Sequence, residues 1–190
     1  MNEAEVKQLF IDTGAILEGH FLLTSGLHSP LYVEKFQVLQ YPEYTAKLCK
    51  ALAEKFAHDQ VELVIGPVTG GILLAHEVGK NLGTRAIFTE RENGKMTLRR
   101  GFIIKPGERV LIVEDIITTG GSVQEVLNVV RENGGIPVGV GILVDRSGGK
   151  VDFGVPHQAL LHLDVKTYQP EDCPLCAQGQ SITKRGSRKL

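Results

Sequence analysis

The sequence predicts an α/β fold in which a mainly parallel, twisted sheet carries helices on both faces, with a small N-terminal hood. Three observations predict it. Mostly apolar runs over residues 61–65, 110–113 and 137–144 are typical of strands buried on both faces of a parallel sheet. The first two runs are each followed by apolar residues at helical spacing. The resulting order of strand, helix, strand, strand, helix and strand is the alternation that builds such a sheet.

The first 40 residues are expected to form a helix and the hood. Val6, Leu9, Phe10, Ile16 and Leu17 follow helical spacing, so we expect an amphipathic helix that ends near Gly19. Residues 21–33 predict two short strands around a polar turn. The core sheet and its helices are expected over residues 60–165 and an irregular segment over 166–190, which makes residues 1–190 a single domain.

The remaining elements follow from apolar spacing and from turn residues. In chain order we expect a helix at 44–58, a strand at 61–65, a helix over 72–78, a strand at 85–89, a polar loop at 90–95, a short hairpin at 97–105, a strand at 110–113, a helix at 123–130, and strands at 137–144 and 157–165.

The most informative stretch is residues 110–122, where an apolar strand ends in Glu114 and Asp115 and then becomes a small, hydroxyl-rich turn. The turn, Thr-Thr-Gly-Gly-Ser, joins the strand to a helix N-terminus, whose free backbone N–H groups and dipole favour a phosphate. Adjacent strand residues point to opposite faces, so the two carboxylates need not act on the same atom. The alternative is a capped helix beside solvated acids.

Two further strand ends carry polar or glycine-rich loops. One is Gly-Pro-Val-Thr-Gly-Gly at residues 66–71, for which tight packing is an alternative explanation, and the other begins at Asp145 and Arg146. Because ligands bind outside the carboxyl ends of the strands in open α/β sheets, we expect all three loops to meet at one site.

Composition narrows the class of protein. The chain is 42% hydrophobic without a long apolar stretch, and its charged N-terminus has no apolar segment of the kind a secretory signal needs, so we expect no membrane association and a cytoplasmic location. A net charge of −1 and a pI near 6.6 give no basic footprint for nucleic acid. The basic tail at residues 184–189 is expected to be solvated.

The three cysteines, Cys49, Cys173 and Cys176, are an odd number, which argues against a disulfide framework. The Cys-Pro-Leu-Cys pair can supply half of a tetrahedral zinc site, with His157 or His162 conceivable as the remainder. Without a second pair at matching spacing, a turn punctuated by proline is the preferred interpretation.

Residues 110–122 resemble the ribose-phosphate motif of the type I phosphoribosyltransferases, which transfer ribose 5-phosphate from phosphoribosyl pyrophosphate (PRPP) to a nitrogenous base. Nearly all 190 residues resemble the orotate phosphoribosyltransferase family within that group. Residues 21–32 are similar to its hood over the base, residues 143–146 to the segment whose arginine contacts orotate, and Thr118 to a threonine also assigned to orotate. Orotate bears a carboxylate, which suits a cation such as Arg146, although this arginine could instead pair with Asp145.

The resemblance implies Mg²⁺-dependent, reversible conversion of orotate and PRPP into orotidine 5′-phosphate and pyrophosphate, in pyrimidine biosynthesis. It implies that Mg²⁺ is bound mainly through PRPP rather than by protein side chains alone, and that the protein is a homodimer with shared lid residues. Lys95, Glu114 and Asp115 are the implied catalytic residues. The implied contacts are Arg91, Lys95, Glu114, Asp115, Ile116, Ile117, Thr118, Thr119, Gly120, Gly121 and Ser122 for PRPP; Val68, Thr69, Gly70 and Gly71, with a cis Val68–Thr69 bond, for pyrophosphate; and Thr118 and Arg146 for orotate.

The lid residues Arg91 and Lys95 fall in a polar segment without apolar anchors, which predicts a mobile loop that closes over pyrophosphate. The alternative is a solvated charged loop, with Arg99 and Arg100 as ordinary surface residues.

The chain departs from the family pattern at several basic positions. Many members carry a lysine in the pyrophosphate loop, where this chain has Thr-Gly-Gly at 69–71, and often a lysine before Ser-Gly in the hood, where it has Thr24. In the lid, Glu92 occupies a basic position and no histidine follows Lys95. Such a pattern could indicate a variant subfamily in which Arg99 or Arg100 compensates. Three other functions remain open: a purine or xanthine phosphoribosyltransferase, a nucleotide-sensing regulator on the same fold, and an α/β domain without activity.

Overall fold

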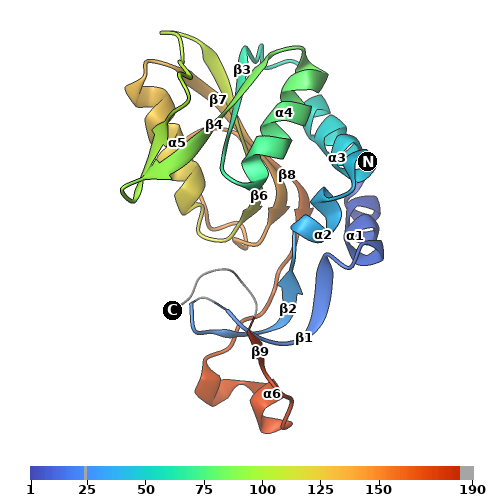
Figure 1. Cartoon of the computed structure of the whole chain (residues 1–190). Helices are drawn as coiled ribbons and strands as arrows, with labels where there is room; N and C mark the ends of the chain where they lie inside the picture. Colours follow the sequence, from blue (N-terminus) through green and yellow to red (C-terminus); the bar gives the residue numbers. More distant parts are fainter. Residues whose placement is uncertain (24, 185–190) are drawn as a thin grey trace.

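The computed structural model describes residues 1–23 and 25–184; Thr24 and the basic tail beyond Lys184 lie outside these ranges. Its main body is a six-stranded sheet in the order β5-β4-β3-β6-β7-β8 (Figure 1). All neighbours are parallel except β5, which runs antiparallel to β4. The strands are β3 (Leu63–Pro67), β4 (Arg85–Glu92), β5 (Lys95–Leu98), β6 (Arg109–Ile117), β7 (Ile136–Asp145) and β8 (His157–His162). The predicted mainly parallel sheet is confirmed.

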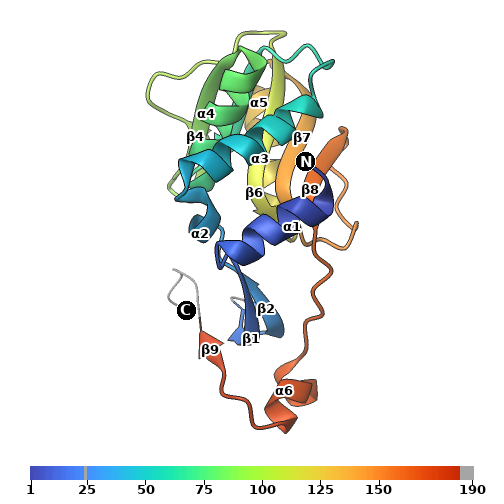
Figure 2. The same cartoon turned by 90° about the vertical axis from the view of Figure 1, so that its right-hand side faces the viewer.

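Helices cover both faces of this sheet because its central strands are apolar on both sides. On one face α1 (Glu3–Asp12), α3 (Pro42–Glu54) and α4 (Gly70–Leu82) share a buried cluster with Val64, Leu111 and Val113 (Figure 2). On the other face α5 (Gly121–Glu132) packs against Ile65 and Ile112. The alternation of residues along β3 and β6 between the two clusters follows directly from the two-residue period of a strand.

The hood lies beyond the carboxyl edge of the large sheet (Figure 1). It is a separate sheet in the order β2-β1-β9, in which β1 (Ile16–Leu22) pairs antiparallel with β2 (His28–Val33) and parallel with β9 (Thr183–Lys184). The short α2 (Phe36–Leu39) leads from the hood into α3. The C-terminal segment contributes η1 (Pro170–Asp172), α6 (Pro174–Ala177) and β9, and so returns to the hood from the end of the core.

The prediction that the first helix ends near Gly19 is wrong, because α1 ends at Asp12. Gly14 adopts the left-handed conformation with φ 67°, and the N–H of Ala15 donates to the carbonyl of Phe10. A glycine in this conformation terminates a helix, so the apolar residues beyond it begin a strand, β1, despite their helical spacing.

The predicted loop at residues 90–95 is instead the turn of a hairpin between β4 and β5, which places Arg91 and Lys95 in paired strands. Asn93 and Gly94 have φ of 50° and 82°, as a two-residue type I′ turn requires. The expected separate hairpin at residues 97–105 is also wrong, because β5 pairs back onto β4 and ends at Leu98.

None of the helices in the described part of the chain is long and apolar enough to cross a membrane.

Candidate active site

The turn between β6 and α5, residues 118–122, borders a small cavity of about 220 Å³ at the carboxyl edge of the sheet. Gly120 has φ 73°, and a Cβ there would lie 2.8 Å from the side chains of Phe153 and Val151, so glycine is required for both conformation and space. Thr118, Thr119 and Ser122 are exposed. Among the described residues, α5 begins without a side-chain cap, which leaves its first N–H groups to a ligand. The cradle therefore suits a phosphate.

Glu114 and Asp115 diverge from β6, as the alternation of strand side chains predicts. Glu114 lines the cavity with the 118–122 turn. Asp115 points the other way, where the Lys35 ammonium lies 2.7 Å and 2.8 Å from its two carboxylate oxygens. Both acids are almost fully buried. The sequence analysis did not identify Lys35 because it lies 80 residues from its partner, with no motif that links them.

Burial governs the protonation of both acids. Burial, together with the negative charge of Asp115, raises the pKa of Glu114 to about 8. Burial also raises the pKa of Asp115, although Lys35 opposes that shift by stabilising the carboxylate. The cavity therefore contains a carboxyl whose pKa is raised toward neutral pH, while the neighbouring Asp115 faces the Lys35 ammonium.

The glycine-rich loop between β3 and α4 meets this site at Asp115. Its Val68–Thr69 peptide bond is cis, as predicted. A Cβ on Gly70 would overlap the Asp115 carboxylate, whereas one on Gly71 would lie 2.8 Å from the backbone of Gly66. Tight packing against Gly66 thus explains Gly71, and the close approach of the loop to the Asp115 carboxyl group explains Gly70.

A larger cavity of about 640 Å³ lies between the hood and the same sheet edge, and it shares Ile116, Thr118 and Thr119 with the phosphate cradle. Leu23, Ser25 and Leu27 of the hood form one side of it. Three cationic residues, Lys35, Arg146 and Lys150, also line it.

Arg146 is the cation best placed to receive an anion in this cavity. Burial lowers the pKa of its guanidinium, and its Nε is buried without a hydrogen-bond partner among the described residues. An unsatisfied buried donor of this kind is costly unless a ligand completes it. The Asp145 carboxylate instead accepts from the backbone N–H of Ser147, so the alternative pairing of Arg146 with Asp145 is not what the structure shows.

The predicted lid residues occupy different positions. Arg91 lines the phosphate cavity, where it donates to Glu125 over 2.8 Å and to the Gly94 carbonyl over 2.9 Å. Lys95 is exposed at the start of β5, and among the described residues it lines neither cavity.

The two arginines that follow the hairpin are engaged with carboxylates. Arg100 forms a bidentate pair with Glu90 at 2.8 Å, and Arg99 lies 3.5 Å from Glu92. In this arrangement both arginines form ion pairs on the hairpin.

Neither histidine considered for a zinc site lies near the Cys-Pro-Leu-Cys pair. His157 stacks edge-on against Phe153, and the Nδ1 of His162 is 3.2 Å from Glu3. The sequence-based choice of partners was therefore wrong; Cys173 and Cys176 instead face two histidines of the hood.

Comparisons with known proteins identify the family. A family model described as "Phosphoribosyl transferase domain" matches residues 37–153. A curated protein of Desulforamulus reducens named orotate phosphoribosyltransferase is 57% identical over 190 residues, with 100% of both chains covered. The chain therefore belongs to the phosphoribosyltransferase family.

Solved structures with a similar fold include phosphoribosyltransferases that are named for different acceptor bases. The crystal structure of orotate phosphoribosyltransferase from Aeropyrum pernix matches with a TM-score of 0.71 at 27% identity, covering 83% of this chain and 93% of that one. Adenine phosphoribosyltransferase from Rhodothermus marinus matches with a TM-score of 0.66 at 23% identity, covering 85% and 100%. Since an orotate and an adenine phosphoribosyltransferase share this fold, the fold alone does not identify the acceptor base.

Proposed function

We infer that this chain is an orotate phosphoribosyltransferase, which transfers ribose 5-phosphate from PRPP to orotate and releases pyrophosphate. The observation that carries this function is the junction of a phosphate cradle with a base-sized cavity that contains buried Arg146. The full-length relatives of the same name support the same acceptor.

The donor is proposed to lie across the carboxyl edge of the sheet. The 118–122 turn would hold the 5′-phosphate with backbone N–H groups and hydroxyls. Glu114 and Asp115, from opposite faces of β6, would accept from the ribose hydroxyls. The cis-bonded loop at Val68, Thr69, Gly70 and Gly71 would donate N–H groups to the departing pyrophosphate.

The reaction needs one bond to form and one to break at ribose C1. The N1 nitrogen of orotate, deprotonated before or during attack, bonds to C1, while the C1–O bond breaks and its electrons leave with pyrophosphate. Arg146 and Lys35 would hold the anionic base so that N1 faces C1, and Thr118 would orient it from the cradle side. Since N1 of orotate loses its proton readily, no strong general base is assigned.

Magnesium fits this site as a partner of the donor. Glu114 is the acid that faces the cavity and would release its proton on binding the ion, while Asp115 is directed away toward Lys35, so the two acids do not form a protein cage. Mg²⁺ commonly takes one or two carboxylates together with substrate phosphates and waters. When bound, it would neutralise charge on the diphosphate.

We expect a cytoplasmic homodimer with shared lid residues, in which the β4–β5 hairpin brings Lys95 to the neighbouring subunit's site while Arg91 lines the cavity of its own chain. Exposure of Lys95 away from both cavities of its own chain supports this arrangement. At an orotate concentration below the KM, a Lys95→Ala subunit mixed with an Arg146→Ala subunit should then show more activity than either variant alone, because one mixed site regains both side chains. Mixtures that stay as inactive as their components would contradict the shared site.

The acceptor is tested by offering orotate, uracil, xanthine, hypoxanthine and adenine separately, with PRPP and magnesium, and measuring pyrophosphate release. We expect release with orotate alone, and much slower release in Arg146→Ala at orotate concentrations below its KM. Arg131→Ala, which removes an exposed arginine of α5 that lines neither cavity, is the matched control and should keep the wild-type release. Release with a purine would favour the purine or xanthine alternative, and silence with every base would favour a regulator or an inactive domain.

A further inference from the structure

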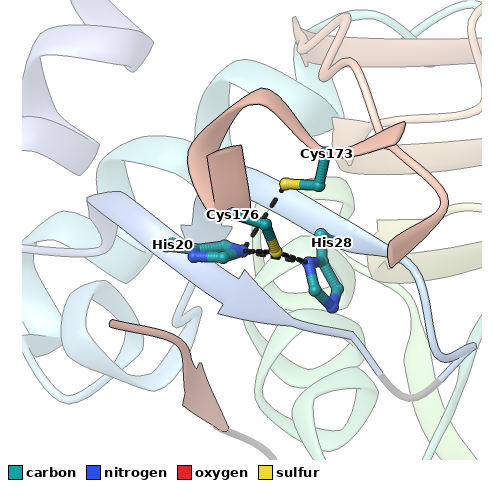
Figure 3. A group of neighbouring side chains, drawn as sticks. All are labelled: His20, His28, Cys173 and Cys176. Carbon is teal, nitrogen blue, oxygen red and sulfur yellow. Dashed lines mark hydrogen bonds between the residues drawn. The ribbon is translucent and has the colours of Figure 1, made fainter. Parts of the chain in front are cut away.

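Four side chains that the active site does not use converge where the C-terminal segment crosses the hood (Figure 3). His20 comes from β1, His28 from the start of β2, and Cys173 and Cys176 from the N-terminus and body of α6. Their ligand atoms all lie within 4.8 Å of one another. His20, His28 and Cys173 are buried, and Cys176 faces solvent.

Four distances within this cluster are close to those between ligands of one small ion. The His20 Nε2 to His28 Nδ1 distance is 3.0 Å, and Cys176 Sγ lies 3.3 Å from that Nδ1. Cys173 Sγ and Cys176 Sγ lie 3.6 Å and 3.8 Å from His20 Nε2. Zinc bonds of about 2.0 Å to nitrogen and 2.3 Å to sulfur place tetrahedral ligands roughly 3.3–3.8 Å apart.

The hydrogen bond on the far side of His20 orients the ring as a ligand. His20 Nδ1 lies 2.9 Å from the carbonyl oxygen of Gln180, which can only accept, so Nδ1 carries the proton. The Nε2 lone pair is then directed into the cluster. A backbone carbonyl on the outer ring nitrogen is the usual support of a metal-bound histidine.

The C-terminal segment, residues 166–184, buries almost no apolar side chains and so needs another interaction to hold it against the hood. In the described part of the chain, neither apolar cluster includes a residue beyond Val165, and Ile182 is 44% exposed. The segment reaches the hood through two β9–β1 pairs and a bridge between His28 and Tyr168. Short segments without a core are commonly held by a disulfide or a structural metal.

We propose that His20, His28, Cys173 and Cys176 bind one zinc ion that ties the C-terminal segment to the hood. Two thiolates and two imidazoles form a closed tetrahedral set, which suits a structural zinc and leaves no open position for catalysis. The oxygen-seeking Mg²⁺ of the transfer reaction is a poor fit to these sulfur and nitrogen ligands. The proposal does not depend on which base the enzyme uses.

The wild-type protein, purified without affinity histidines or chelators, provides the first test. Elemental analysis should find about one zinc per chain, as a single closed site predicts. X-ray absorption at the zinc edge should resolve two sulfur ligands near 2.3 Å and two nitrogen ligands near 2.0–2.1 Å, within about 0.2 Å. This measurement requires no variant, so it stands even where substitutions hinder folding.

Variants then locate the ion. Cys176→Ser and His20→Ala should each lose most of the zinc, while His157→Ala and Cys49→Ala, which change the same residue types away from the cluster, should retain it. Chelation should raise amide hydrogen exchange in residues 166–184 of the wild type and leave the parallel core strands protected.

Three outcomes would overturn the proposal. The first is wild-type protein that contains no zinc after expression in zinc-supplemented medium and purification without chelators. The second is recovery of Cys173 and Cys176 as a disulfide under conditions in which Cys49 stays reduced. The third is zinc that remains bound at full stoichiometry in the Cys176→Ser and His20→Ala variants, which would place the ion elsewhere.

Discussion

Replacing Glu114 with Gln should remove a pH dependence of stability that the wild type shows between about pH 4.5 and 8. Glu114 is 7% exposed, and burial first and the charge of Asp115 second raise its pKa from 4.5 to about 8. In this interval the native state holds a proton that the unfolded chain releases. The contribution of Glu114 to stability is therefore fully present below pH 4.5 and is lost as the pH rises through 8.

The size of this effect follows from the width of that interval. At about 1.36 kcal/mol per pH unit, the change in the free energy of unfolding across it is at most about 5 kcal/mol. Urea unfolding of the wild type and of Glu114→Gln at several pH values between about 5 and 8 measures it. The wild type should lose stability relative to the variant as the pH rises, because glutamine cannot ionise.

The matched control is Glu125→Gln, which changes a half-exposed glutamate on the rim of the same cavity. Its pH dependence should follow that of the wild type. If Glu114→Gln instead keeps the wild-type slope across the whole interval, Glu114 is ionised in the native state and the reasoning from burial fails.

Three other substitutions test the site. Gly70→Ala should lower the free energy of unfolding by about 1–3 kcal/mol in urea melts, because its Cβ would overlap the Asp115 carboxylate; an unchanged midpoint would contradict that contact. Arg146→Ala should raise the KM for orotate about tenfold or more in steady-state assays and leave the KM for PRPP nearly unchanged; equal changes in both would argue against a role in base binding. Lys35→Met should raise the pKa of Asp115 further, because it removes the cation that stabilises the carboxylate. The acid limb of the pH profile of kcat/KM should therefore move to higher pH. An unchanged acid limb would show that the ionisation of Asp115 does not control activity.

Local sequence signals predicted the part of the fold that positions the donor site. The runs at residues 61–65, 110–113 and 137–144 became β3, β6 and β7, because β-branched apolar residues favour strands that are covered on both faces. The Thr-Thr-Gly-Gly-Ser turn lies at the N-terminus of α5, as predicted, because a strand-to-helix junction is specified by neighbouring residues. Opposite placement of Glu114 and Asp115 follows from the strand period alone.

The errors arose where turn chemistry outweighs apolar spacing. Ile16 and Leu17 continue the helical spacing of α1, yet Gly14 ends that helix first. Asn93 and Gly94 form the turn of a hairpin, although the charged residues around them suggested an unstructured loop. In both places a single left-handed residue or pair determined the direction of the chain.

The contacts missed altogether join residues that are far apart in the sequence. Lys35 and Asp115 are 80 positions apart, and His20 and Cys173 are 153 apart. His20 and His28 are separated by eight residues, a spacing that suggests no metal motif until the β1–β2 pairing places them at one end of the hood. Such pairs require the tertiary structure, since no local rule relates one member to the other.

The hood lies between the larger cavity and the histidine and cysteine cluster, and it contributes residues to both. Its loop places Ser25 and Leu27 against the base cavity, and the next residue, His28, belongs to the histidine and cysteine cluster. His28 also bridges to Tyr168, so the same residue anchors the C-terminal segment. Because the hood has little apolar core of its own, the position of its loop depends on how firmly β1 and β2 are held at the end that adjoins this loop. The proposed zinc site would therefore stabilise the wall that selects the base while remaining outside the chemistry.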